Sequence, residues 1–174
     1  MKRLRVSICI LSFMILSGCS IQSSQLSMLI GFVKTPQLDL STNAWLVKYV
    51  DYEAIVYAVS VPEGTLFSNN AGDEVLFDGW SIRRVRGLGH RGSAYQNSDV
   101  DNQRSFKRGR VGLAIHLCDD WQVKVQSGKK RFSQRCGSQK TYTNSILVVE
   151  DGSISSIRQV VDDRYTTVTL TKLR

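Results

Sequence analysis

The sequence has few of the residues, and none of the motifs, on which most catalytic and metal sites depend. Its 174 residues include only two histidines, His90 and His116. No HExxH, GxSxG, Walker-type or EF-hand pattern occurs, so nothing points to a zinc protease, a serine hydrolase, a P-loop nucleotide site or a calcium loop. We therefore predict no catalytic residues, no metal site and no cofactor, and expect a protein that is not an enzyme.

Long hydrophobic runs and helical periodicity are also lacking. The most apolar stretch, residues 6–16, has 11 residues, whereas a helix that spans a bilayer needs about 20. No segment after Val33 shows a sustained helical period. Residues 44–49 and 53–61 are instead rich in β-branched and aromatic side chains, and Thr alternates with apolar residues over 166–171. We predict a mostly β fold, an antiparallel β-sandwich or open barrel built from hairpins.

Turn signals place the hairpins. Asp78-Gly79 lies between two apolar stretches, and Asp-Gly favours a two-residue type I′ turn. Asp151-Gly152 repeats the pattern, and Ser127 to Lys130 separates two further strand-like runs. The stretch from Gly87 to Arg110 is polar with little alternation, so we expect a long loop with a short strand near residues 93–97.

The N-terminus predicts export and lipidation. Basic residues 2–5 precede the apolar run, which ends in Leu16-Ser17-Gly18-Cys19. A basic start, an apolar core and small residues describe a secretory signal, and Leu-Ser-Gly-Cys resembles the lipobox of bacterial lipoproteins. That resemblance implies cleavage before Cys19 and acylation of its sulfur, and Ser20 resembles an outer-membrane sorting signal.

These signals divide the chain into three parts. We predict a signal peptide over 1–18, a lipidated tether with a short apolar segment over 19–33, and a β-rich periplasmic domain over 34–174. The expected location is the periplasmic face of the outer membrane, with the membrane contacted through the lipid. In such an oxidising compartment the two remaining cysteines of the domain, Cys118 and Cys136, are free to pair.

The spacing of those cysteines supports a disulfide. Cys118 and Cys136 lie at nearly equal distances from Ser127 in the sequence. A hairpin that turns near Ser127 therefore brings them opposite one another, at the short Cβ separation of cross-strand neighbours. Two buried free thiols are the alternative.

Basic residues gather in the middle of the chain. Between residues 83 and 110 there are eight, including Arg104, against the two acids Asp99 and Asp101. We interpret seven of them as a possible surface for an anionic ligand: Arg83, Arg84, Arg86, Arg91, Lys107, Arg108 and Arg110. A solvated face without a ligand is the alternative. Trp121 and Tyr142 are near enough in sequence to stack on sugars, although core packing explains them equally well.

Some side chains have simpler interpretations. His116 alternates with apolar neighbours in a strand-like run, so we expect it on the solvated face of a strand. The pairs Asp119-Asp120 and Asp162-Asp163 are typical of turns, where carboxylates hydrogen-bond the backbone.

Two stretches carry a further resemblance. Residues 57–89 lead from an apolar strand through a polar turn to EVLFDGWSIRRVRGLG, and residues 145–174 read SILVVEDGSISSIRQVVDDRYTTVTLTKLR. Both are similar to the group 4 capsule polysaccharide lipoprotein family, GfcB/YjbF. The resemblance implies an outer-membrane lipoprotein with a non-enzymatic accessory role in capsule or exopolysaccharide export.

The expected function follows that resemblance. We predict an accessory role in polysaccharide export or envelope assembly, with an anionic polysaccharide or an export protein as partner and no nucleic acid. An inhibitor or binding module like the lysozyme-inhibiting lipoproteins is the alternative. A third possibility is an envelope hydrolase, which an open polar cleft with paired acids would favour.

Overall fold

Every regular element that the structure describes is a β-strand. The computed structural model describes residues 43–89 and 94–173, and its strands belong to one compact unit, Asp39–Arg174. The strands are β1 (Ala44–Tyr49), β2 (Tyr52–Val61), β3 (Gly64–Ser68), β4 (Glu74–Phe77), β5 (Ile82–Arg86), β6 (Ala94–Val100), β7 (Gln103–Arg108), β8 (Val111–Cys118), β9 (Gln122–Gln126), β10 (Lys129–Gly137), β11 (Thr141–Val148), β12 (Ile154–Val160) and β13 (Thr167–Lys172). Cys19 with its lipobox, the tether, His90 and Arg91 lie outside the described residues.

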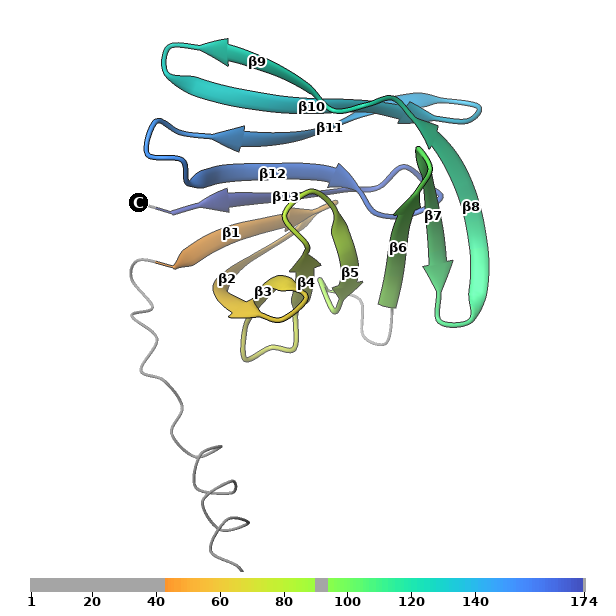
Figure 1. The fold of residues 1–174 in the computed structure, drawn as a ribbon. Helices are drawn as coiled ribbons and strands as arrows, with labels where there is room; N and C mark the ends of the chain where they lie inside the picture. The colour runs from red at the N-terminus through yellow and green to blue at the C-terminus, as the bar shows by residue number, and fades with distance from the viewer. Residues whose placement is uncertain (1–42, 90–93, 174) are drawn as a thin grey trace, which may run out of the picture. The chain divides into compact units, whose positions relative to one another are not determined.

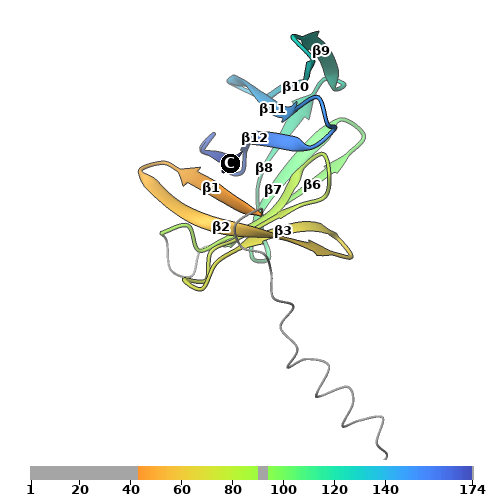
Figure 2. The ribbon, with the colours of Figure 1, turned by 90° about the vertical axis from the view of Figure 1, so that its left-hand side faces the viewer.

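Twelve of the thirteen strands close into an antiparallel ring. From β1 to β8 each strand pairs with the next along the chain, β8 then pairs with β10, and β10 to β13 lead back to β1 by way of β11 and β12. The remaining strand, β9, lies beyond β8 on the same edge of β10 (Figures 1 and 2). The predicted mostly β, antiparallel fold is confirmed, and the closed ring makes it a barrel.

Half of the barrel interior is apolar. One row of cross-strand neighbours consists of Ile146, Ile157, Leu170 and Val47, which come from β11, β12, β13 and β1. All four are buried. Burial of such a side chain contributes about 1.5–3 kcal/mol, so these rows provide the main cohesion of β11 to β13 and β1 to β5.

The other half of the interior is polar. Along β6, β7, β8, β10 and β11 the alternating inward positions hold charged, amide or imidazole side chains that are all buried. They are Asn97, Arg104, His116, Gln134 and Asn144. Buried polar groups require hydrogen-bond partners, so this half of the barrel depends on a network of side-chain contacts.

The hairpin at Asp78-Gly79 forms, but its predicted two-residue turn is wrong. Phe77 pairs with Ile82, so the loop has the four residues Asp78–Ser81. Only Gly79 among them has a positive φ, of 106°. The Asp78 carboxylate instead accepts hydrogen bonds from the backbone N–H groups of Trp80 and Ser81, which stabilises the wider loop. The same correction applies to Asp151-Gly152, whose loop is flanked by the pair Val148 and Ile154.

The long loop predicted from Gly87 to Arg110 is also wrong, except for the short strand expected near residues 93–97, which corresponds to the start of β6. Much of it forms β6 and β7, which pair from Tyr95 with Arg108 to Val100 with Gln103. The turn between them is Asp101-Asn102, with φ angles of 49° and 61°. The sequence hides these strands because their inward side chains are largely polar, so the apolar alternation that marks most strands is weak.

The two cysteines lie opposite one another at the shortest strand pairing of the ring, between β8 and β10. β8 and β10 pair at only two positions, one of which is Cys118 with Cys136. Their sulfur atoms lie 2.05 Å apart, at the distance of a disulfide. The predicted proximity is confirmed, and so is the hairpin behind it, whose two-residue turn is Ser127-Gly128.

We predict that the native protein contains this disulfide and needs it. Mass analysis after alkylation without reductant should show neither Cys118 nor Cys136 modified. The double variant Cys118→Ser/Cys136→Ser should lose about 3 kcal/mol of unfolding free energy in urea, because the bridge closes a loop with a sequence separation of 18. Two alkylated thiols in the native protein would contradict the prediction.

Candidate functional site

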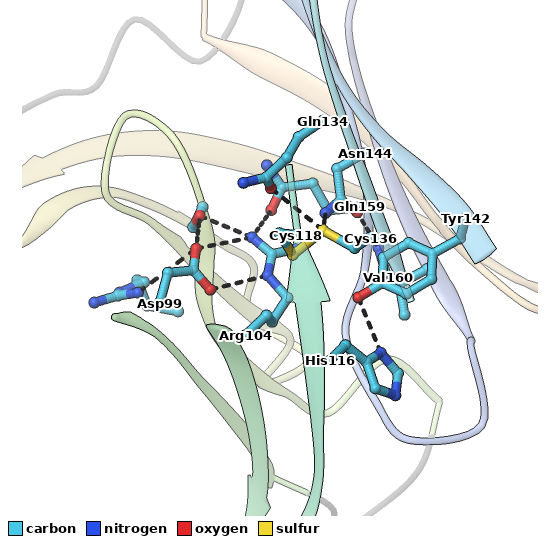
Figure 3. The surroundings of a disulfide bond; sticks show 12 residues. Asp99, Arg104, His116, Cys118, Gln134, Cys136, Tyr142, Asn144, Gln159 and Val160 are labelled. Atoms are coloured by element: carbon cyan, nitrogen blue, oxygen red, sulfur yellow. Dashed lines mark hydrogen bonds and ion pairs between the residues drawn. A yellow bond between two sulfur atoms is a disulfide. The ribbon is translucent and has the colours of Figure 1, made fainter. Parts of the chain in front are cut away.

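The centre of the polar half is a fully buried arginine. Arg104 in β7 has no exposed surface. Its Nε and Nη2 atoms each lie 3.0 Å from an oxygen of Asp99, and Nη2 also donates to Ser81 Oγ at 2.8 Å and to Gln159 Oε1 at 3.4 Å. Dashed lines in Figure 3 mark these contacts. The interior arginine is therefore neutralised by a carboxylate from the neighbouring strand. Arg104, which the sequence places among the eight basic residues between 83 and 110, thus lies in the interior of the barrel.

Asp99 stays ionised in this environment. Burial acts against its charge, but the hydrogen bonds and positive charge of Arg104, with smaller effects of Ser81 and Arg83, outweigh burial and lower the pKa of Asp99. Arg83 lies 3.9 Å from the same carboxylate. Asp99 is thus a fixed anion shared by two arginines.

Gln159 holds the 78–81 loop against the barrel. This buried β12 side chain accepts a hydrogen bond from Ile82 N at 2.8 Å and donates one to Trp80 O at 2.6 Å. Asp78 accepts from Trp80 N at 2.9 Å. The backbone of Trp80 is therefore held from both sides, which fixes the point from which its indole extends.

Three aromatic rings gather at this loop. Trp80 lies 5.6 Å from Trp121 and 5.4 Å from Phe132, measured between ring centroids, and meets Phe132 edge to face. Trp80 keeps 49% of its surface exposed. A large indole held partly in solvent is unusual for packing alone and typical of a binding surface.

Two of these rings, Trp80 and Trp121, border a pocket of about 300 Å³. Apart from Trp80, Trp121, Val100 and Cys118, its lining is polar: Asp78, Ser81, Arg83, Asp99, Asp101, Asn102, Gln103 and Gln134. Carboxylate, guanidinium and amide groups present paired donors and acceptors, and the indoles present flat apolar faces. This combination suits a small polyhydroxylated ligand that has both hydroxyl groups and an apolar face.

The described members of the predicted basic surface lie in different local surroundings. Arg83 is the extra residue of a bulge in β5, which turns its side chain to the pocket, where it pairs with Asp78 at 3.1 Å. Arg84 and Lys107 are exposed and share the polar row of Gln96, while Arg86 pairs across strands with Glu74. Arg108 lies over the Tyr95 ring at 4.8 Å, and Arg110 is exposed in the turn after β7.

His116 points the opposite way from the prediction. Its ring is buried, whereas the neighbouring Ile115 and Leu117 are 61% and 68% exposed. His116 Nδ1 lies 3.1 Å from Tyr142 Oη, and the ring stacks on Tyr165 at 5.1 Å. Burial, with the charge of Arg104, lowers the pKa of His116, and burial raises that of Tyr142 to about 12. The alternation was recognised correctly, but here the polar side faces inward.

The two aromatic residues predicted to stack on sugars, Trp121 and Tyr142, lie in different parts of the barrel. Trp121 lines the pocket, while Tyr142 contacts His116 and Tyr165. Asp162 behaves as the predicted turn carboxylate and accepts hydrogen bonds from Arg164 N and Thr166 N. Trp80 was missed, although an aromatic residue directly after a turn signal is a sign of exposure.

The site has to be interpreted from its own geometry. No protein-family model, no curated protein and no solved structure matches the chain significantly. Within residues 43–89 and 94–173, no helix has the length and apolarity needed to cross a membrane.

We predict that removal of the buried cation destabilises the barrel strongly. Arg104→Met removes a fully buried cation and leaves Asp99, whose side chain is 30% exposed, without its main partner. Removal of one partner of a buried ion pair costs about 3–5 kcal/mol of unfolding free energy, and we expect the lower end of that range because Asp99 keeps contact with solvent and with Arg83. The matched control is Lys48→Met, which removes the cation of the exposed Lys48–Glu53 pair and should cost less than about 1 kcal/mol. Urea titration of both variants tests the difference, and equal losses would contradict the role given to Arg104.

We also predict that the protein loses stability as the pH falls. The pKa of His116 is lowered from 6.5 in the folded state, so below pH 6.5 the unfolded chain binds a proton that the folded one resists, and stability declines. Asp99 adds a second loss below 3.8, because its folded pKa is lowered too. Urea midpoints across pH should show a flatter profile just below 6.5 for His116→Phe. An unchanged profile would show that His116 does not carry this dependence.

Proposed function

We propose that this chain is an envelope lipoprotein that binds a saccharide in the pocket beside Trp80 and serves, without catalysis, in polysaccharide export or envelope assembly. The carrying observation is the fixed, half-exposed Trp80 at the edge of a polar pocket. The axial C–H groups of a pyranose give it an apolar face that packs on an indole. Its hydroxyl groups can bond to amides and carboxylates such as Gln103, Gln134 and Asp78, which line the same pocket.

The carboxylates of the pocket support binding rather than hydrolysis. Glycoside hydrolysis requires a carboxylic acid that keeps its proton, together with a second carboxylate. The pKa of Asp99 is lowered by Arg104, so Asp99 is unsuited to donate a proton. Asp78 is occupied by two backbone N–H groups and by Arg83. Both carboxylates act as fixed hydrogen-bond acceptors.

The charge of the pocket favours a neutral saccharide. Three carboxylates line it, those of Asp78, Asp99 and Asp101, together with the single guanidinium of Arg83. Arg104 does not line the pocket, but its positive charge neutralises Asp99 from the interior. An anionic sugar would be repelled by this excess of acid. The exposed cations Arg84, Arg86 and Lys107 remain the predicted contacts for an anionic polysaccharide outside the pocket.

We predict that Trp80→Ala weakens saccharide binding by about tenfold or more, equal to about 1.4 kcal/mol. The measurement is retardation of the native protein in gels that contain a neutral polysaccharide such as dextran or galactomannan, compared with gels that contain alginate. Ile55→Ala is the matched control, because Ile55 is also a half-exposed apolar residue, at 50% against 49% for Trp80. Equal retardation of both variants, or none of the native protein by the neutral polymers, would refute the pocket.

The lipid anchor has its own test. Cys19→Ser should leave the protein unprocessed, or release it from the membrane fraction, because the thiolate of Cys19 is the nucleophile that takes the lipid. Metabolic labelling with a palmitate analogue and fractionation of the envelope measure both effects. If the variant matures and fractionates as the native protein does, the chain is not a lipoprotein.

A further inference from the structure

β9 has an open edge. It pairs with β10 over five positions, and no other strand among the described residues pairs with it. All five of its residues are exposed, and in both views it lies away from β2 and β3 (Figures 1 and 2). Because β9 is the last strand on its side of the sheet, the backbone groups along its whole outer edge have no strand partner among the described residues and are offered to solvent.

The turn of the hairpin fixes which residues face that edge. Ser127 and Gly128 both have positive φ, of 50° and 72°, as a type I′ turn requires. The residues flanking such a turn form a hydrogen-bonded pair, and bonded and non-bonded pairs alternate along the strands. Gln126 and Lys124 are therefore at bonded positions, and the backbone N–H and C=O groups of Val123 and Val125 point to the open edge.

The two faces of β9 differ sharply. Val123 and Val125 are 54% and 67% exposed on one face, and Val123 pairs with Phe132. The other face borders a groove of about 450 Å³, whose lining includes Lys124, Lys129 and Arg131. An added strand would thus meet apolar side chains on one face and cations on the other.

The cations favour an acidic occupant. From residue 122 to residue 149 the sequence contains no Asp or Glu. Glu150 brings one acid to the tip, because its side chain lies against Gly128. A second copy of β9 would place Lys124 close to another Lys124, and like charges on neighbouring strands are destabilising. The edge therefore disfavours pairing with itself.

We propose that the open edge of β9 binds an extended segment of a partner protein, in which apolar and acidic residues alternate, as an added antiparallel or parallel strand. Main-chain hydrogen bonds to Val123 and Val125 hold the segment, as in other cases of strand addition. Its apolar side chains pack beside the two valines, and its carboxylates meet Lys124 and Arg131. This interface is separate from the saccharide pocket and does not depend on it.

The test uses a fluorescein-labelled peptide with four Val-Glu repeats, titrated with the full chain purified in mild detergent and followed by fluorescence anisotropy. Saturable binding is expected, at least tenfold weaker for a peptide of four Val-Lys repeats. Val125→Pro should abolish binding, because proline removes an N–H at the open edge without removing a bond to β10. Val125→Thr keeps that N–H and should still bind.

A variant with a reversed charge tests the proposal without introducing proline into the strand. Lys124→Glu should weaken binding of the Val-Glu peptide at least tenfold and improve binding of the Val-Lys peptide. The proposal is overturned if neither peptide binds, or if Val125→Pro binds as well as Val125→Thr. It is also overturned if sedimentation shows a dimer that Val125→Pro dissociates, or if removal of residues 20–40 is needed before the peptide binds, since a second copy or the chain itself would then occupy the edge.

Discussion

The double contact between Arg104 and Asp99 is the interaction on which the polar half of this barrel depends. A charge inside a protein is tolerated only with a partner and with further hydrogen bonds. Here Ser81 and Gln159 accept further hydrogen bonds from Arg104 Nη2, while Nη1 is buried without a hydrogen-bond partner among the described residues. The cluster joins the β6–β7 hairpin to the 78–81 loop and to β12, which lie 23 and 55 residues from Arg104 in the sequence. It therefore replaces, in this half, the cohesion that apolar side chains supply in the other.

The same cluster explains why the candidate site is ordered. Gln159 contacts both Arg104 and the backbone on either side of Ser81, so the charge pair and the position of Trp80 are coupled. A binding group that is fixed in advance loses little conformational freedom when a ligand arrives. The buried charge pair that stabilises the polar half of the interior therefore also holds the 78–81 loop, which carries Trp80, in place.

The sequence predicted those parts of the molecule in which apolar side chains face inward. Val47 and Leu170 alternate with polar residues, and their strands were recognised. β7 was taken for a loop and β6 was predicted only near residues 93–97, because Asn97 and Arg104 occupy inward positions that usually hold apolar residues. His116 was placed on the wrong face for the same reason. A sequence shows that two faces differ, but which one is buried depends on partners such as Asp99 and Tyr142, which only the fold brings near.

The candidate site was predictable only in pieces. The pairing of Cys118 with Cys136 followed from their equal distances to a turn, and Trp121 was noted as an aromatic residue available for sugars. The partnership of Trp121 with Trp80 and the selection of Arg83 by a bulge are long-range or irregular features that no local pattern contains. Lipidation at Cys19 and the basic surface remain predictions.

The position of the disulfide has a mechanical consequence. β8 and β10 share only two paired positions, and the β9–β10 hairpin extends from that junction. The other edge of β10 is held to β11 by eight pairs, so a force that pulls the hairpin away from β8 would act first on this short seam. The covalent link lies within the seam itself, so tension on the hairpin passes into β8 and the ring instead of opening it.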